Sequence, residues 1–346
     1  MRPSWRGAWR RPRPAVVEPR PVAAFIGDAP AQLERVYDAA ARARLASLTA
    51  LKPGVLSGAG LAGAADADYL FSTWGMPALD GAAWRRLPRL KAVFYAAGSV
   101  QGFARPLLAG GVRVFSAWEA NAAPVAQYCL AQILLAGKGF LARSRALHGA
   151  GPAAWAPGAV RGNRSGSVAL LGAGKVAQAL IGLMKPFHLK VLVYDPFLTP
   201  DQAGRLGVEK VTWAQAFSRA QVLSNHLPDL AETRGSIDAP SLASLPPGAC
   251  FINTGRGASV DEAGLWRVLA QRPDLTAVLD VCASEPPEAD SPAYRLPNVF
   301  LSPHLAGSLG DELPALAHAM IDELEALLQG RAPRAEVTLE QLSRLA

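Results

Sequence analysis

The sequence predicts an α/β protein built on doubly wound parallel sheets. Short apolar runs alternate with helical stretches from Val22 onward, which is typical of parallel strands covered by helices. A glycine-rich turn joins one such run to a helical stretch at residues 172–177. Polar residues follow several runs, at the strand ends where ligands bind in such sheets. A chain of 346 residues is long enough for two domains of this kind.

The first part of the chain is expected to hold four strands. Their apolar runs lie at residues 22–26, 69–74, 90–97 and 112–115. A long apolar helix is expected over about residues 123–142 and would lead into the second part of the chain.

The glycine-rich turn has the order strand, G-x-G-x-x-A, helix, strand, acid. Residues 167–171 are the expected strand and residues 176–184 the helix, which would end near Pro186. Gly172 allows the tight turn, and Gly174 lets the backbone approach a pyrophosphate at the helix N-terminus. The pattern predicts a dinucleotide-binding site.

Asp195 ends the next expected strand, residues 190–194, about 20 residues after Gly174. At that distance a carboxylate accepts hydrogen bonds from the adenosine ribose hydroxyls. The carboxylate would repel a 2′-phosphate, and the next residues, Pro196 and Phe197, supply no arginine to receive one. NAD is therefore favoured over NADP, although Asp195 could also simply end a strand before a turn.

Three polar residues stand where later apolar runs stop. Arg256 follows the run at 249–253, Glu285 the run at 275–281, and His304 the run at 299–303. A guanidinium can bind a carboxylate in bidentate fashion, and an imidazole oriented by a carboxylate can transfer a proton. Together these residues predict redox chemistry on an oxo acid. Each alone could instead be a surface arginine, a turn residue or a packed histidine.

In their order and spacing, these motifs resemble the D-isomer-specific 2-hydroxyacid dehydrogenases over about residues 22–330. The resemblance rests on GAGKVA at 172–177, YDP at 194–196, NHLP at 225–228, NTGRG at 253–257 and SPHLAG at 302–307. It implies a Rossmann NAD-binding domain and a flavodoxin-like substrate domain, with the active site in the cleft between them. The implied boundaries are 22–118 with 308–346 for the substrate domain and 119–307 for the NAD-binding domain.

The resemblance also implies the site residues. Arg256 would bind the substrate carboxylate, and His304 with Glu285 would be the acid/base pair. Cofactor contacts are implied at Gly172, Gly174, Lys175, Val176, Asp195, Leu227, Pro228, Thr233, Thr254, Gly255 and Asp280. Backbone groups in the loop at 95–102 would bind the substrate carboxylate at Gly98, Ser99 and Val100. Trp74 either lines the substrate pocket or packs in the core or at the surface.

Some positions depart from the family or lie outside its site. Gln101 stands where relatives usually have Asp, and Gln127 where they often have Glu. His226 follows an apolar run but is expected to be structural. The three cysteines lie in apolar runs without the spacing of a metal site, so neither a metal nor a disulfide framework is expected.

The net charge of +7 is concentrated in the first 20 residues, which hold six arginines and one glutamate. We expect residues 1–21 to be a disordered basic tail. No apolar run reaches transmembrane length and no signal peptide is evident, so a cytoplasmic protein is expected. Binding of nucleic acid through the tail stays a minor alternative.

The implied function is the NAD-dependent interconversion of a 2-oxo acid and a D-2-hydroxy acid in a homodimer. The alternative is an NAD(H)-sensing interaction protein of the corepressor kind, with little turnover. The absence of Lys and Arg from the 95–102 loop disfavours a phosphorylated substrate, and the sequence leaves the identity of the acid open.

Overall fold

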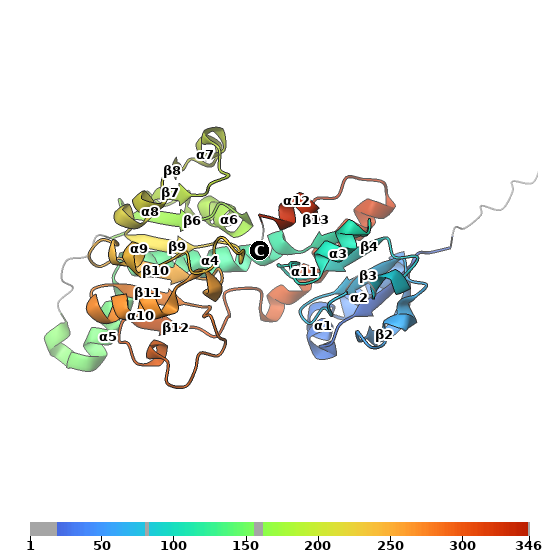
Figure 1. The fold of residues 1–346 in the computed structure, drawn as a ribbon, viewed down its shortest axis with the longest axis horizontal. Coiled ribbons are helices and arrows are strands. Elements are labelled where there is room, and N and C mark those ends of the chain that lie inside the picture. Colours follow the sequence, from blue (N-terminus) through green and yellow to red (C-terminus); the bar gives the residue numbers. More distant parts are fainter. Residues whose placement is uncertain (1–18, 80–82, 156–161, 345–346) are drawn as a thin grey trace, which may run out of the picture.

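The structure, a computed structural model, describes residues 19–79, 83–155 and 162–344. Residues 1–18 of the predicted basic tail therefore lie outside the described residues. Two sheets, each covered by helices on both faces, lie side by side along the long axis of the molecule (Figure 1). The predicted doubly wound α/β fold is confirmed.

The first sheet has six strands in the order β13-β5-β4-β3-β1-β2, and all pair in parallel except β13 with β5. The order of its parallel strands, 2-1-3-4-5, is that of flavodoxin-like sheets. Its strands are β1 (Val22–Ile26), β2 (Ala50–Leu56), β3 (Tyr69–Ser72), β4 (Ala92–Tyr95), β5 (Arg113–Ser116) and β13 (Glu336–Val337).

The second sheet has seven parallel strands in the order β12-β11-β10-β9-β6-β7-β8. Counted from β6, this is the Rossmann order with one added strand at the edge. Its strands are β6 (Ser167–Leu171), β7 (Lys190–Tyr194), β8 (Glu209–Lys210), β9 (Val222–Asn225), β10 (Cys250–Asn253), β11 (Thr276–Leu279) and β12 (Val299–Leu301).

Helices bury the apolar side chains on both faces of each sheet. On the first sheet, one face is covered by α1 (Pro30–Val36), α2 (Ala39–Leu48) and α11 (Leu313–Leu328), and the other by α3 (Ala104–Ala109) and α12 (Leu339–Leu342). On the second sheet, one face is covered by α4 (Trp118–Gly137), α6 (Lys175–Met184) and α7 (Pro200–Leu206), and the other by α8 (Trp213–Arg219), α9 (Ala239–Ala243) and α10 (Glu262–Gln271).

The long helix expected over residues 123–142 was placed wrongly at both ends. Helix α4 begins at Trp118, so Pro124 lies inside it rather than at its first turn. It ends before Gly139, whose φ of 62° breaks the helix, and α5 (Phe140–Ala150) follows. Among the described residues no single helix is long and apolar enough to cross a membrane, although the bent pair Trp118–Gly137 and Phe140–Ala154 meets the length and composition criteria together.

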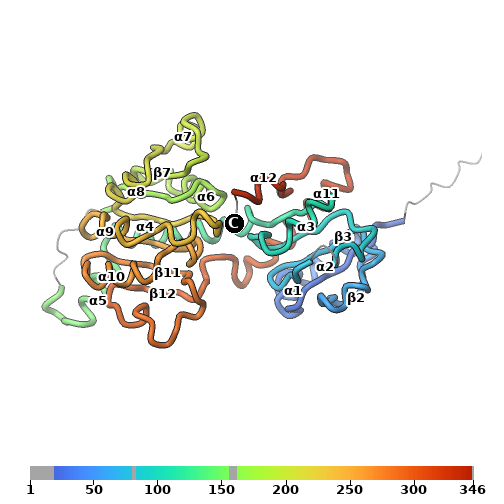
Figure 2. The backbone as a smooth tube through the Cα atoms, in the orientation of Figure 1, coloured from blue at the N-terminus to red at the C-terminus, as the bar shows by residue number. Residues whose placement is uncertain are grey.

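The chain crosses between the two sheets twice (Figure 2). It leaves the first sheet after β5 through α4 and returns after β12 into α11, whose side chains Leu316, Met320 and Leu324 are fully buried against the first sheet. Strand β13 then completes that sheet, and Arg113 on β5 binds Glu336 on β13 through two hydrogen bonds of 2.7 Å.

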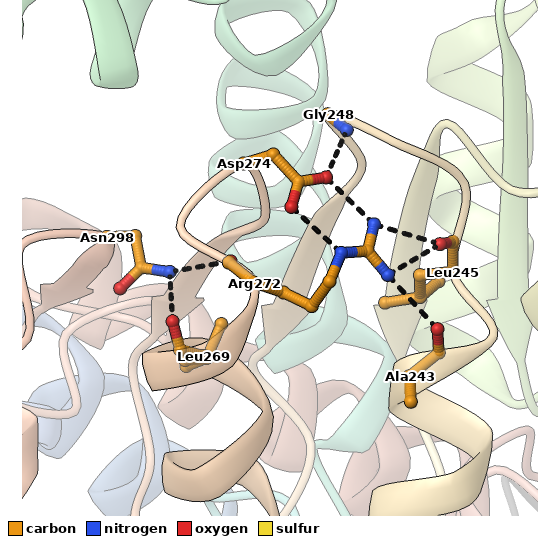
Figure 3. A network of polar contacts seen from close by, with 7 residues as sticks. All are labelled: Ala243, Leu245, Gly248, Leu269, Arg272, Asp274 and Asn298. Atoms are coloured by element: carbon orange, nitrogen blue, oxygen red, sulfur yellow. Dashed lines mark hydrogen bonds and ion pairs between the residues drawn. The ribbon is translucent and has the colours of Figure 1, made fainter.

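A polar network ties together the amino ends of the last strands of the second sheet (Figure 3). Arg272 binds the Asp274 carboxylate through two hydrogen bonds of 2.8 Å. Asp274 also accepts from the Gly248 amide, and Arg272 donates to the carbonyl of Ala243. The bond with Arg272 is the main reason that the pKa of Asp274 falls to about 2. This network lies at the end of the sheet opposite to the carboxyl ends of its strands.

We predict that Asp274→Asn destabilises the fold in a pH-dependent way. The pKa of Asp274 is lower in the folded state, so its stabilisation is present at neutral pH and is lost as pH falls from about 4 towards 2. Because the side chain is partly exposed, we expect a loss of about 0.5–1 kcal/mol near pH 7. Urea unfolding of the wild type and Asp274→Asn at pH 7 and about pH 3 measures this loss of unfolding free energy. Glu288→Gln, at an exposed carboxylate, is the control; an equal loss for Asp274→Asn at both pH values would contradict the prediction.

Candidate active site

A buried network of polar side chains shapes the loop that carries Arg256. At the ends of β9 and β10, Asn225 Nδ2 donates to Asn253 Oδ1 at 2.9 Å and to Ser259 Oγ at 2.7 Å. Ser259 Oγ in turn donates to the Arg256 carbonyl at 2.7 Å. Asn225, Asn253 and Ser259 are almost fully buried. Because buried polar groups need partners, this network restricts the loop to one path.

Arg256 is half-buried at the carboxyl end of β10, and its Nη1 donates to the Gly255 carbonyl at 2.8 Å. Burial lowers the pKa of its guanidinium, and the negative charges of Asp229 and Glu285 oppose that shift. A Cβ on Gly257 would lie 2.0 Å from the Cys282 carbonyl carbon, so only glycine lets this loop pack against the loop that carries Glu285.

Glu285 and His304 form a direct pair. His304 Nδ1 lies 2.6 Å from Glu285 Oε2. The imidazole side chain is 57% exposed, and its Nδ1 is held by the carboxylate. A hollow of about 390 Å³ with a mainly apolar lining lies beside the pair. Its apolar lining consists of Pro286, Pro287, Tyr294, Leu301 and Pro303.

Asp280 fixes the loop that carries His304. Its Oδ1 accepts from Ser302 Oγ at 2.6 Å and from the Leu305 amide at 2.9 Å, and its Oδ2 accepts from the Ala306 amide at 2.9 Å. Its carbonyl accepts from the His304 amide at 3.0 Å. His304 has a φ of 50° and is the one non-glycine residue in the described part of the chain with a positive φ. Such a conformation costs about 1–3 kcal/mol and needs support of this kind.

Tyr128 on α4 extends this arrangement. Its hydroxyl lies 2.8 Å from Ser302 Oγ, and since the Ser302 proton is directed at Asp280, Tyr128 is the donor. Neither Tyr128 nor Ser259 was identified from the sequence. The partner of Tyr128, Ser302, lies 174 residues away in the chain. Ser259 is bonded to Asn225, which belongs to a separate motif.

The two glycines of the glycine-rich turn differ in whether the fold itself requires glycine. Gly172 has a φ of 96°, and a Cβ there would lie 2.9 Å from the His226 carbonyl oxygen, so the fold itself requires glycine. Gly174 has a φ of −68°, and a Cβ there would meet nothing within 4 Å. The fold therefore has room for a side chain at Gly174, so local packing does not require glycine there.

Asp195 stands at the end of β7 beside this turn. Its Oδ2 accepts from the Ala173 amide at 2.8 Å, and its Oδ1 accepts from the Phe197 amide at 2.7 Å. It lines a hollow of about 350 Å³. The other lining residues are Ala173, Gln178, Phe197, Leu198, Gln202, Arg205 and Leu206. The hollow therefore lies beside the glycine-rich turn, at the end of β7.

The remaining residues implied as cofactor contacts lie around the same strand ends. Lys175, in the first turn of α6, forms an ion pair with Glu119 of α4. Thr254 Oγ1 lies 3.1 Å from Cys129 Sγ. Leu227 is buried, and Thr233 Oγ1 donates to the Pro228 carbonyl at 2.5 Å. Val176 packs partly buried in α6, and Gly255 follows Thr254 directly.

The loop with Gly98, Ser99 and Val100 follows β4 of the first sheet. Ser116 Oγ donates to the Gly98 carbonyl at 2.5 Å, and the Val100 side chain is buried. Asn121 links this loop to the His304 side of the molecule. Its Oδ1 accepts from the Ser308 amide at 3.2 Å, and its Nδ2 would lie 3.4 Å from a Cβ on Gly98. No motif in the sequence pointed to Asn121, which lies in an alanine-rich stretch.

Other candidates have structural environments. Burial lowers the pKa of His226 to about 4, and its Nε2 lies 2.9 Å from Ser224 Oγ, as expected of a structural histidine. Trp74 packs against the apolar cores on both faces of the first sheet. Burial is the main reason that the pKa of Cys282 rises to about 11. Among the described residues, no three His, Cys, Asp or Glu side chains are grouped to hold a metal ion.

Comparisons with known proteins identify the family of this chain. The family model for "D-isomer specific 2-hydroxyacid dehydrogenase, NAD binding domain" matches residues 135–306. The (S)-sulfolactate dehydrogenase of Chromohalobacter salexigens is 31% identical over 225 residues, which cover 64% of this chain and 72% of that protein. This chain belongs to the D-isomer specific 2-hydroxyacid dehydrogenase family. The resemblance inferred from the motifs is confirmed.

Two further proteins are similar to this chain, one over part of its sequence and one in its fold. The D-3-phosphoglycerate dehydrogenase of Mycobacterium tuberculosis is 33% identical over 205 residues, 59% of this chain. That match spans 38% of the length of the Mycobacterium protein. A phosphoglycerate oxidoreductase from Rhizobium etli has the same fold, with a TM-score of 0.79 at 21% identity, over 94% of this chain and 100% of that one.

We predict that one substitution in the glycine-rich turn lowers stability and that another weakens NADH binding. Gly172→Ala should lower the free energy of unfolding by about 2 kcal/mol or more, because of its positive φ and the contact with His226. Gly174→Ala should leave stability unchanged but weaken NADH binding at least tenfold, because its methyl group would occupy space needed by the pyrophosphate. Thermal unfolding and NADH fluorescence titration measure the two effects. Wild-type NADH affinity in Gly174→Ala would contradict the assignment of this turn.

Proposed function

We propose that this protein is an NAD-dependent oxidoreductase that interconverts a 2-oxo acid and a D-2-hydroxy acid. The observation that carries the proposal is the 2.6 Å contact between His304 Nδ1 and Glu285 Oε2 at the ends of the last strands of the second sheet. It orients an exposed imidazole through Nδ1 and leaves Nε2 for proton transfer. The half-buried Arg256 lies on the loop that packs against the Glu285 loop.

In this proposal, Arg256 binds the substrate carboxylate through its guanidinium, together with backbone amides at Gly98, Ser99 and Val100. His304, protonated, donates from Nε2 to the C2 oxygen as the oxo acid is reduced. In the oxidative direction the neutral imidazole accepts the hydroxyl proton at the same atom. Glu285 holds Nδ1 and stabilises the imidazolium, which keeps Nε2 directed at the substrate.

The cofactor would be held by the turn at Gly172 and Gly174, by Lys175 and Val176 at the start of α6, and by Asp195. Further contacts are proposed at Leu227, Pro228, Thr233, Thr254, Gly255 and Asp280. When bound, NADH supplies the hydride that reduces C2. The open space at Gly174 and the hollow beside Asp195 support this assignment.

We also propose that residues 22–118 and 308–346 form the substrate domain and residues 119–307 the NAD-binding domain. The distribution of strands between the two sheets supports this division. A homodimer is part of the proposal. Helix α5 buries none of its residues, and it exposes Phe140, which suits contact with a second copy.

The first test is to mix the purified protein with NADH and a panel of oxo acids and to follow NADH oxidation. The panel holds glyoxylate, pyruvate, hydroxypyruvate and the oxidised forms of 3-phosphoglycerate and sulfolactate. We expect turnover on at least one acid, and His304→Gln should reduce kcat about 100-fold or more by removing the general acid. His188→Gln, at an exposed histidine, should retain wild-type rates.

Two outcomes would overturn the proposal. Turnover that survives His304→Gln would exclude this imidazole as the proton donor. Tight NADH binding with no turnover on any acid would instead favour the NAD(H)-sensing alternative.

Arg256→Ala should reduce kcat/KM for the oxo acid about 100-fold or more, since a charge-assisted bidentate contact to the carboxylate would be lost. Arg256→Lys should recover part of that loss, because it retains the charge but not the planar fork. Arg267→Ala, which removes an exposed arginine from α10, is the control. Unchanged kcat/KM in Arg256→Ala would show that the carboxylate is bound elsewhere.

A further inference from the structure

One short segment contacts both halves of the proposed site. Residues 338–344 follow β13 and comprise α12 with Ser343 and Arg344. Figures 1 and 2 show α12 near the middle of the molecule, where the two halves meet. Thr338 and Gln341 cap the helix reciprocally, with hydrogen bonds of 3.1 and 2.9 Å, and so fix its path.

The segment holds the loop proposed to bind the substrate carboxylate. Gln101 Nε2, directly after Val100, donates to the Leu342 carbonyl at 2.6 Å. The last carbonyls of a helix lack partners within it, so this amide satisfies one of them. The side chains of Leu342 and Val100 are buried in the same apolar core. The loop and α12 are therefore joined by a hydrogen bond and by packing.

The same segment reaches the hollow beside Asp195. The Arg344 guanidinium carbon lies 4.8 Å from the centroid of the Phe197 ring, which is within cation–π range. Glu340, one turn earlier, holds the guanidinium at 3.2 Å. Phe197 lines the hollow, and its amide donates to Asp195 Oδ1. Arg344 thus joins a segment of the first sheet to the cofactor side of the second.

We propose that Gln101 and Arg344 are positioning residues that couple binding of the oxo acid to binding of the cofactor. The inference rests on the proposed function. A cofactor that fills the hollow packs against Phe197 and favours the arrangement in which Arg344 covers the ring. That arrangement in turn holds α12 and the Gly98–Val100 loop in place for the substrate. Because coupling between two sites is reciprocal, each ligand tightens the binding of the other by the same factor.

The test measures NADH binding by tryptophan fluorescence, without and with saturating oxalate, an unreactive dicarboxylate that resembles a 2-oxo acid. In the wild type we expect oxalate to tighten NADH binding about fivefold or more. Arg344→Ala should reduce that factor to about twofold or less, a change within the range of an exposed cation–π contact. Its kcat in the oxo-acid assay should stay within about twofold, with the KM values raised.

Two conservative variants separate positioning from stability. Arg344→Lys retains a cation over Phe197 and should restore most of the coupling. Gln101→Glu replaces the donor amide by an acceptor of equal size, so it should lose coupling as Arg344→Ala does. Arg35→Ala, which removes an exposed guanidinium bonded to Gln32 on α1, should retain the wild-type factor.

The outcomes distinguish this inference from the proposed function. A wild type that neither binds NADH nor turns over any acid overturns both. A wild type that turns over but binds NADH equally well with and without oxalate overturns the coupling alone. If oxalate tightens NADH binding in Arg344→Ala and Gln101→Glu by the same factor as in the wild type, even with a lowered Tm, these contacts are only structural. That result would also overturn the proposed coupling.

Discussion

The buried carboxylate of Asp280 is the constraint on which the rest of the site depends. A carboxylate that is 3% exposed must be satisfied by hydrogen bonds, because an unpaired buried charge is too costly to retain. Here the donors are the Ser302 hydroxyl and the amides of Leu305 and Ala306, all in the loop around His304. The cost of burying one charge thereby fixes the backbone of the proposed acid/base residue in a conformation that it would not adopt alone.

The other parts of the site are arranged around this loop by similar means. Asn225 and Asn253 direct the Arg256 loop, and Gly257 allows it to approach the Glu285 loop. The side chains proposed to act on ligands are comparatively exposed, whereas those that position them are buried. Specific geometry at the surface is thus produced by polar networks beneath it, as expected where preorganisation is required.

The sequence predicted the centre of the second sheet well. The bounds of β6 and β7 agree with their apolar runs, because glycine and aspartate mark the strand ends directly. The edge strands β2, β8 and β13 were missed, whereas the edge strand β12 lies within the expected run at 299–303. Strand β2 contains Lys52, Pro53 and Gly54, because an edge strand needs neither a continuous apolar pattern nor a full set of hydrogen bonds. The ends of α4 were wrong because its alanine-rich composition continues smoothly across them.

The residues proposed to transfer a proton or bind a carboxylate could be singled out in the sequence because each has a distinctive chemistry and follows a strand. The residues that hold them could not. Asn121, Tyr128 and Ser259 are common residue types, and their roles come from partners that only the fold brings near. The contact between Gln101 and Leu342 joins positions 241 residues apart, a separation that no local pattern can reveal.

The return of the chain to its first sheet has a consequence for biosynthesis. The face of that sheet under α11 and the edge beside β5 are completed only by residues from 313 onward, after the whole second sheet has been translated. Until then the nascent chain carries a bare apolar face and an open strand edge, both of which favour aggregation. The second sheet, which is continuous in sequence, is able to fold first on the ribosome. The half of the protein that is made first is therefore the half that matures last.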